Sequence, residues 1–70
     1  MQTMTVQEKC AEAGQVTVDA HNDRAGYDIE DVNHGIVMTL VDIVAYAQTN
    51  GIDFDVAVQE AYETLGDITR

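Results

Sequence analysis

The feature that most constrains this chain is an unusually wide apolar surface on one predicted helix. Residues 35–55 read GIVMTLVDIVAYAQTNGIDFD. At about 100° of rotation per residue, the apolar side chains spread over roughly 220° of a helix surface. They are Ile36, Val37, Leu40, Val41, Ile43, Val44, Ala45 and Ala47. Because an amphipathic helix usually hides a stripe about half that wide, we expect other protein surfaces to cover much of this helix.

Turn-forming residues divide the chain into three predicted helices, over about residues 5–22, 28–50 and 53–66. The segments between them, NDRAGYD and NGID, are rich in residues that favour turns. The chain has no proline, low-complexity tract or internal repeat, so we expect a single helical domain over residues 1–70. The predicted fold class is all-α: a three-helix antiparallel unit that assembles into a helical-bundle homo-oligomer.

Capping residues indicate where these helices begin and end. Thr5 and Glu8 match the capping-box pattern, so the first helix should begin at Thr5. Asp28 and Asp53 are the predicted N-caps of the second and third helices. Gly66 is predicted to end the third helix.

The first helix has one weak region, GQVTVDA at residues 14–20. Gly14 lowers helix propensity, and Val16, Val18 and Ala20 alternate as they would in a strand. We favour a helix because an isolated strand would have no partner, and the strand stays open as the alternative.

A chain of 70 residues needs stabilisation beyond its own core. At this size a single core rarely supplies more than about 3–5 kcal/mol, and the lone Cys10 excludes an internal disulfide. Oligomerisation or metal binding is therefore expected. The part of the second helix that its neighbours leave uncovered includes Val37, Val41 and Ala45, which we predict to contact a second subunit.

The charge of the chain limits its partners. Thirteen acidic residues against three lysines and arginines give a formal net charge of −10, which repels phosphate backbones, so no direct nucleic-acid binding is expected. The acidity has three possible explanations: a solvated surface, a divalent-cation site, and a surface that docks on a basic partner or imitates nucleic acid. A solvated surface is the explanation that applies by default to a small acidic protein. No signal-peptide pattern and no long apolar segment is present, so we expect a cytoplasmic protein without membrane contact.

Residues 40–70, LVDIVAYAQTNGIDFDVAVQEAYETLGDITR, resemble the last helices of MazG-like all-α nucleoside triphosphate pyrophosphohydrolases and their phosphoribosyl-ATP pyrophosphohydrolase relatives. In that family a long apolar helix ends in a glycine, a GID-like turn follows, and a helix with an acidic start closes the domain. The resemblance covers a little under half of the chain. It implies tight helical dimers or tetramers and magnesium-dependent hydrolysis between the α and β phosphates of a nucleotide.

The metal motifs of that family, E-x-x-E and E-x-x-D, are not preserved. In the family's register the E-x-x-D positions fall on Gly35 and Met38, and Glu8 and Glu12 are four residues apart instead of three. No catalytic residue is therefore carried over. Antiparallel pairing of the first two helices would place Glu8 and Glu12 opposite Asp42, and these three carboxylates are the candidate ligands of a sparse magnesium site.

Two functional hypotheses follow. The first is a small acidic interaction or regulatory protein of phage or mobile-element type, which resembles a reduced, non-catalytic MazG-like module, needs no cofactor and docks on a partner with a basic surface. The second is a minimal magnesium-dependent nucleoside triphosphate pyrophosphohydrolase that uses Glu8, Glu12 and Asp42 across subunits. A zinc site is not expected, because the closely spaced Cys and His ligands that zinc requires are absent.

Overall fold

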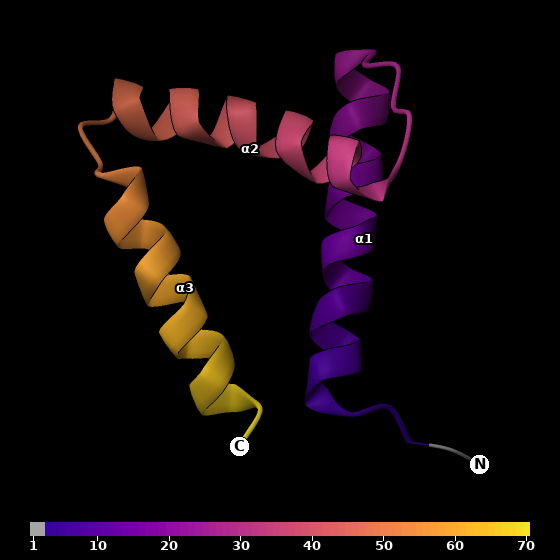
Figure 1. The fold of residues 1–70 in the computed structure, drawn as a ribbon, viewed down its shortest axis with the longest axis vertical. Coiled ribbons are helices and arrows are strands. Elements are labelled where there is room, and N and C mark those ends of the chain that lie inside the picture. Colours follow the sequence, from indigo (N-terminus) through magenta and orange to yellow (C-terminus); the bar gives the residue numbers. More distant parts are fainter. Residues whose placement is uncertain (1–2) are drawn as a thin grey trace.

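The computed structural model describes residues 3–70, which form three helices and no strand. They are α1 (Val6–Ala25), α2 (Val32–Thr49) and α3 (Phe54–Ile68). Figure 1 shows an open arch in which α1 and α3 are the two legs and α2 is the bridge between them. The all-α class is confirmed, and the strand alternative for residues 14–20 is wrong because α1 runs through them.

Local capping chemistry sets the first and last helix starts, as predicted. The Glu8 backbone N–H donates to Thr5 Oγ1 at 3.1 Å, and the Thr5 N–H donates to Glu8 Oε1 at 3.2 Å, which completes the capping box. The Asp53 carboxylate accepts from two backbone N–H groups in the first turn of α3. At the other end of α1, Gly26 has φ 76° and closes the helix in the left-handed conformation that favours glycine.

The predicted start of α2 at Asp28 is wrong. Asp31 is the N-cap, and its Oδ1 accepts from the His34 backbone N–H at 2.7 Å. The residues between Gly26 and Asp31 are not helical, and two of their side chains lie against α2. The Tyr27 hydroxyl hydrogen-bonds to a residue in the middle of α2, and Ile29 packs beside the first turn of α2.

The predicted end of α3 at Gly66 is also wrong, because the helix continues to Ile68. A glycine inside a helix costs only about 1 kcal/mol. The backbone N–H of Thr69 still donates to the Leu65 carbonyl at 3.1 Å. One glycine without a following turn signal is therefore too weak to stop this helix.

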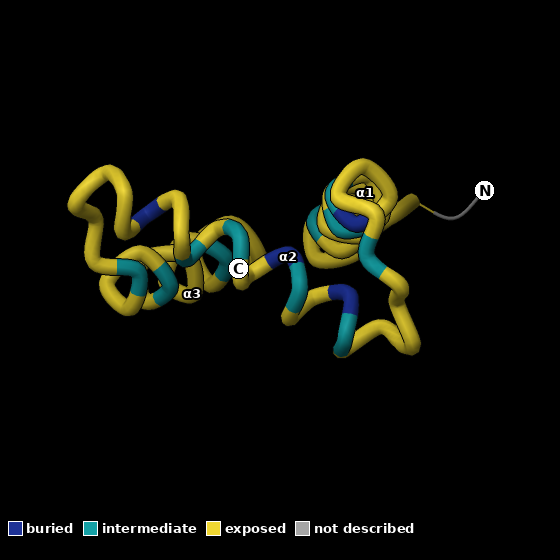
Figure 2. The backbone as a smooth tube through the Cα atoms, turned by 90° about the horizontal axis from the view of Figure 1, so that it is seen from above, coloured by how far each residue is buried: buried dark blue, intermediate teal, exposed yellow. Residues whose placement is uncertain are grey.

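The helix α2 crosses α1 near the C-terminal end of α1 and does not run beside it (Figures 1 and 2). The predicted antiparallel arrangement is therefore not confirmed. Gly35 allows the close crossing, since a Cβ there would lie 3.3 Å from Val18 Cγ1 and 3.4 Å from Ile29 Cγ2. Gly14 lies away from this contact, and apart from its chain neighbours and its own helix backbone no described atom lies within 4 Å of the position its Cβ would take.

The single chain buries very little of itself, as the mostly yellow tube in Figure 2 shows. Within residues 3–70, Ala47 is the sole buried apolar side chain. The accessible surface is 5836 Å², whereas a compact monomer of this mass exposes about 4300 Å². The radius of gyration is 13.9 Å, against about 11 Å for a compact chain of this length. The arch is thus one layer of helices whose apolar faces lack an opposing layer.

Candidate functional site

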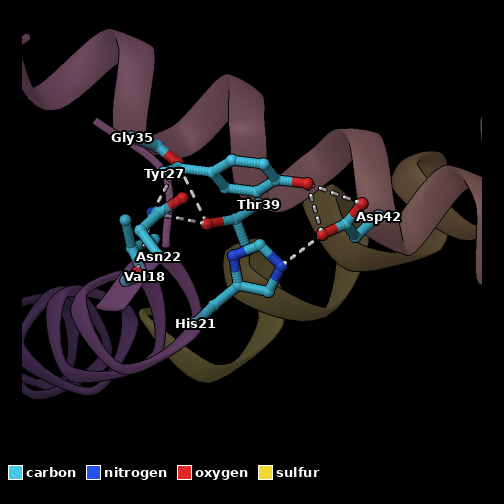
Figure 3. Close-up of polar contacts among 7 residues, drawn as sticks. All are labelled: Val18, His21, Asn22, Tyr27, Gly35, Thr39 and Asp42. Atoms are coloured by element: carbon cyan, nitrogen blue, oxygen red, sulfur yellow. Dashed lines mark hydrogen bonds and ion pairs between the residues drawn. The ribbon is translucent and has the colours of Figure 1, made fainter. Parts of the chain in front are cut away.

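A polar cluster occupies the crossing of α1 and α2 (Figure 3). We call it the crossing cluster, and it consists of His21, Asn22, Tyr27, Thr39 and Asp42. The first two residues come from the last turns of α1, Tyr27 comes from the loop, and the last two come from α2. The cluster therefore joins every element that meets at this end of the arch.

The Asn22 amide ties the two helices together. Its Nδ2 donates to the Val18 carbonyl at 2.8 Å within α1, and across the crossing to the Gly35 carbonyl and Thr39 Oγ1, both at 3.1 Å. The Thr39 hydroxyl in turn donates to the Gly35 carbonyl at 2.9 Å. Because two backbone carbonyls surround Nδ2, the amide orientation is fixed with its nitrogen in the crossing. Asn22 is only 4% exposed, and its Oδ1 is buried with no hydrogen-bond donor among residues 3–70.

The Asp42 carboxylate accepts from two side chains on the other elements. His21 Nε2 lies 2.9 Å from Oδ2, and the Tyr27 hydroxyl donates at 3.0 Å to Oδ2 and 3.2 Å to Oδ1. The hydrogen bond to Asp42 raises the pKa of Tyr27, and desolvation and the negative charge of Asp42 add to the effect. The neutral Tyr27 hydroxyl is thereby kept as a donor that holds the loop against α2.

The three predicted magnesium ligands are far apart. Glu8 and Glu12 lie toward the N-terminal end of α1, whereas Asp42 of α2 lies near the C-terminal end of α1. Glu8 closes the capping box, Glu12 is exposed one turn later, and Asp42 contacts His21 near the other end. Along the α1 axis, His21 is about 20 Å from Glu8 and about 14 Å from Glu12 at 1.5 Å per residue. In the described part of the chain no three potential ligands gather. One chain does not assemble this site, and a site built across subunits stays a prediction.

Sequence reasoning missed His21 and Tyr27 as partners of Asp42. The sequence did contain a signal that Asp42 needs polar partners, because it is the one Asp or Glu among the 18 residues of α2. A carboxylate inside an apolar helix requires hydrogen-bond donors or water around it. The identity of those donors depends on how α2 crosses α1, which no local pattern in the sequence specifies.

A groove of about 1120 Å³ lies between α1, the connecting loop and the start of α2. We call it the α1–α2 groove. Its apolar lining includes Gly14, Val18, Ile29, Val32 and Ile36. Three exposed aspartates also line it, namely Asp19, Asp23 and Asp31. The groove therefore combines an apolar surface with negative charge.

The residues predicted to contact a second subunit form one exposed strip on α2. Val37, Val41 and Ala45 repeat every four residues and so lie on one side of the helix. Val37 is 46% exposed and Val41 is 50% exposed in the single chain. We call these three residues the Val37 strip, and their contact with another chain stays a prediction.

Comparison with known proteins finds no matching family model, and no curated protein or solved structure shows significant similarity. The MazG-like resemblance of residues 40–70 thus stays a prediction. None of the helices in residues 3–70 is long and apolar enough to cross a membrane.

Proposed function

We propose that this chain is a small acidic interaction protein that works as a homo-oligomer and docks on a partner protein with a basic surface. The observation that carries the proposal is the excess of exposed surface. The chain exposes 5836 Å², which is about 1500 Å² more than a compact monomer of its mass.

The size of this excess favours self-association through a large interface. A standard interface buries about 800 Å² on each partner, and obligate homodimers bury about 2000–5000 Å² in total. Burial of the excess on two copies would give about 3000 Å², within that obligate range. Large apolar side chains of α2 that are 39% to 50% exposed supply much of this surface: Val37, Leu40, Val41 and Ile43.

The distribution of charge also favours α2 as the contact between copies. Two chains that each carry −10 repel one another wherever their carboxylates meet. Of the thirteen acidic residues, α2 carries only Asp42, whose carboxylate already accepts from His21 and Tyr27. Pairing through α2 therefore buries apolar surface with little like-charge contact.

Burial of α2 would leave the acidic segments on the outside of the assembly. Helices α1 and α3 each carry four acidic residues, and the remaining four lie in the loops and caps. A surface of this sign attracts basic partners and steers their approach. A reduced MazG-like module without the family's metal motifs is consistent with this role.

The enzyme hypothesis has less support from the geometry. Asp42 is held by His21 and Tyr27, and Glu8 is held by the Thr5 backbone N–H. Magnesium-dependent hydrolysis needs several carboxylate oxygens that converge on the ion and the substrate phosphates. A binding role requires no such convergence.

Solution mass is the direct test. We expect sedimentation equilibrium, from low micromolar to near-millimolar protein, to report a multiple of 7.7 kDa at all but the lowest concentrations. A compact, cooperatively melting species of 7.7 kDa throughout that range would contradict the homo-oligomer. A pyrophosphate-release assay with magnesium and nucleoside triphosphates tests the enzyme, and turnover that Asp42→Asn abolishes would replace the binding role with catalysis.

A further inference from the structure

We propose that the α1–α2 groove is the docking site for a cationic amphipathic helix of a partner protein. This inference rests on the proposed function and specifies where and how the partner binds. The groove lies beside the crossing cluster, and the Val37 strip is not part of its lining. Self-association and partner docking would therefore use different surfaces of the same arch.

The form of the groove suits a segment of polypeptide better than a small molecule. The groove is open to solvent along one side, whereas pockets for drug-sized ligands bury about 70–90% or more of the ligand surface. One wall is α1, with Gly14 and Val18, and the other is the first turns of α2, with Val32 and Ile36. Val32 is 80% exposed, and an incoming apolar side chain would cover it. The α1–α2 groove, which lies between two helices and has a mainly apolar lining, therefore matches the helix-in-groove mode of recognition.

Charge selects a basic occupant and disfavours a second copy of this chain. Asp19 and Asp23 are one helical turn apart on α1, about 6 Å along the axis, and Asp31 lies on the opposite side at the start of α2. In residues 3–70 no lysine, arginine or histidine forms an ion pair with any of the three. A second copy would bring a net charge of −10 to these carboxylates. A helix with lysine or arginine flanking its apolar stripe would pair with them.

Asn22 belongs both to the crossing cluster and to the lining of the groove, so its side-chain amide can report on an occupant. Asn22 lines the groove, and its buried Oδ1 has no donor among the described residues. Buried carbonyl oxygens of this kind are normally hydrogen-bonded. The amide cannot turn over to find a donor, because its Nδ2 is held by the Val18 and Gly35 carbonyls. This oxygen exposes less than 1 Å² of surface, so an occupant could bond it only after Asn22 moves, and the Asn22 side-chain amide would report that movement.

The test uses three synthetic peptides of about 18 residues, a length that spans the helical period several times. The first is an amphipathic leucine–lysine helix, the second has the same composition in scrambled order, and the third replaces lysine by glutamate. The full chain is isotope-labelled, and binding is followed by amide chemical shifts. We expect the first peptide alone to bind and to shift Gly14, Val18, Gly35 and the side-chain amide of Asn22.

Substitution of two glycines gives one variant that fills the groove and one matched control that does not. Apart from its chain neighbours and its own helix backbone, a Cβ at Gly14 or at Gly66 meets no described atom within 4 Å, so a side chain can leave either helix without a clash at its first atom. Gly14 lines the groove, whereas Gly66 lies in α3. We expect Gly14→Leu to weaken peptide binding by at least about tenfold, because a side chain that overfills a packed site is costly. Gly66→Leu should change it by less than about twofold.

A second pair of variants tests whether the aspartates of the groove attract the cationic peptide. We expect the double variant Asp19→Asn and Asp23→Asn to weaken binding by about fivefold, as the loss of two exposed ion pairs predicts. Glu60→Gln with Glu63→Gln removes the same charge from α3 and should leave binding unchanged. Equal losses in both double variants would show attraction by net charge alone and would overturn the site.

The outcomes separate this inference from the proposed function. Equal binding of the scrambled peptide, or insensitivity to Gly14→Leu in an oligomeric protein, would overturn the groove and leave self-association in place. Groove-specific binding by a chain that sediments at 7.7 kDa would support the groove and overturn the homo-oligomer.

Discussion

The substitution Val41→Asp tests whether the Val37 strip holds two copies of the chain together. Val41 is 50% exposed in the single chain, so a charged residue there is solvated as long as the chain is alone. In a dimer with two-fold symmetry the same strip from both copies enters the interface, and the substitution acts twice. The effect should therefore appear in association and hardly at all in the fold of one chain.

The magnitude follows from the surface that remains exposed. Full burial of a valine side chain contributes about 1.5–3 kcal/mol, so burial of the remaining half contributes about 1 kcal/mol. Two copies lose about 2 kcal/mol of dimerisation free energy, equivalent to a roughly 30-fold higher dissociation constant. The carboxylates must also be desolvated next to an already acidic partner, which costs several kcal/mol per ion. A 30-fold weakening is thus the lower limit.

Sedimentation equilibrium of wild type and variant at matched salt measures this change. Val16→Asp on α1 is the control, because Val16 is 63% exposed and lies outside both the strip and the groove. We expect Val41→Asp to shift the mass toward 7.7 kDa and Val16→Asp to leave it unchanged. Unchanged association of Val41→Asp would refute the strip as the interface, and equal dissociation of both variants would point to total charge instead.

Four further predictions concern the fold of the single chain. The Asp42→Asn variant should lower the Tyr27 titration midpoint toward 10.0 in ultraviolet absorbance, because the hydrogen bond to Asp42 raises the pKa of Tyr27. The stability from this raised pKa is fully present below pH 10.0 and is lost as the pH rises through the pKa in the folded protein, so Tyr27→Phe should flatten the alkaline part of the stability profile. Gly14→Ala should raise the free energy of unfolding in urea by about 1 kcal/mol, because it improves helix propensity at a position with open space around it. Asn22→Ala should lower that free energy by about 1–3 kcal/mol, and Asn22→Asp should lower it further because an oxygen would then face two carbonyls.

The number of helices was predictable because the relevant signals are local. The capping box of Thr5 and Glu8 and the cap at Asp53 each depend on residues within four positions of one another. The start of α2 was not predictable in this way, since Asp28 and Asp31 are both suitable N-caps. Contacts of the preceding loop with α2 decide between them, and those contacts exist only after α1 and α2 have met.

The crossing cluster could not be predicted from local sequence patterns for the same reason. Asn22 and Gly35 are 13 residues apart, and His21 and Asp42 are 21 residues apart. An antiparallel pair and a steep crossing are both compatible with the same helical periodicity. The close approach at Gly35 selects the crossing, and that choice separates Asp42 from Glu8 and Glu12.

The helix α3 has no buried residue in the single chain, although its apolar side has Phe54, Val58 and Leu65 half-buried. Little tertiary packing therefore holds this leg in place, and its amide protons should exchange with solvent sooner than those at the α1–α2 joint. Any association that covers α3 would slow that exchange in proportion to occupancy. In the proposed pairing through α2, α3 stays outside the contact, so its amide exchange should remain fast at every protein concentration while the crossing of α1 and α2 stays protected.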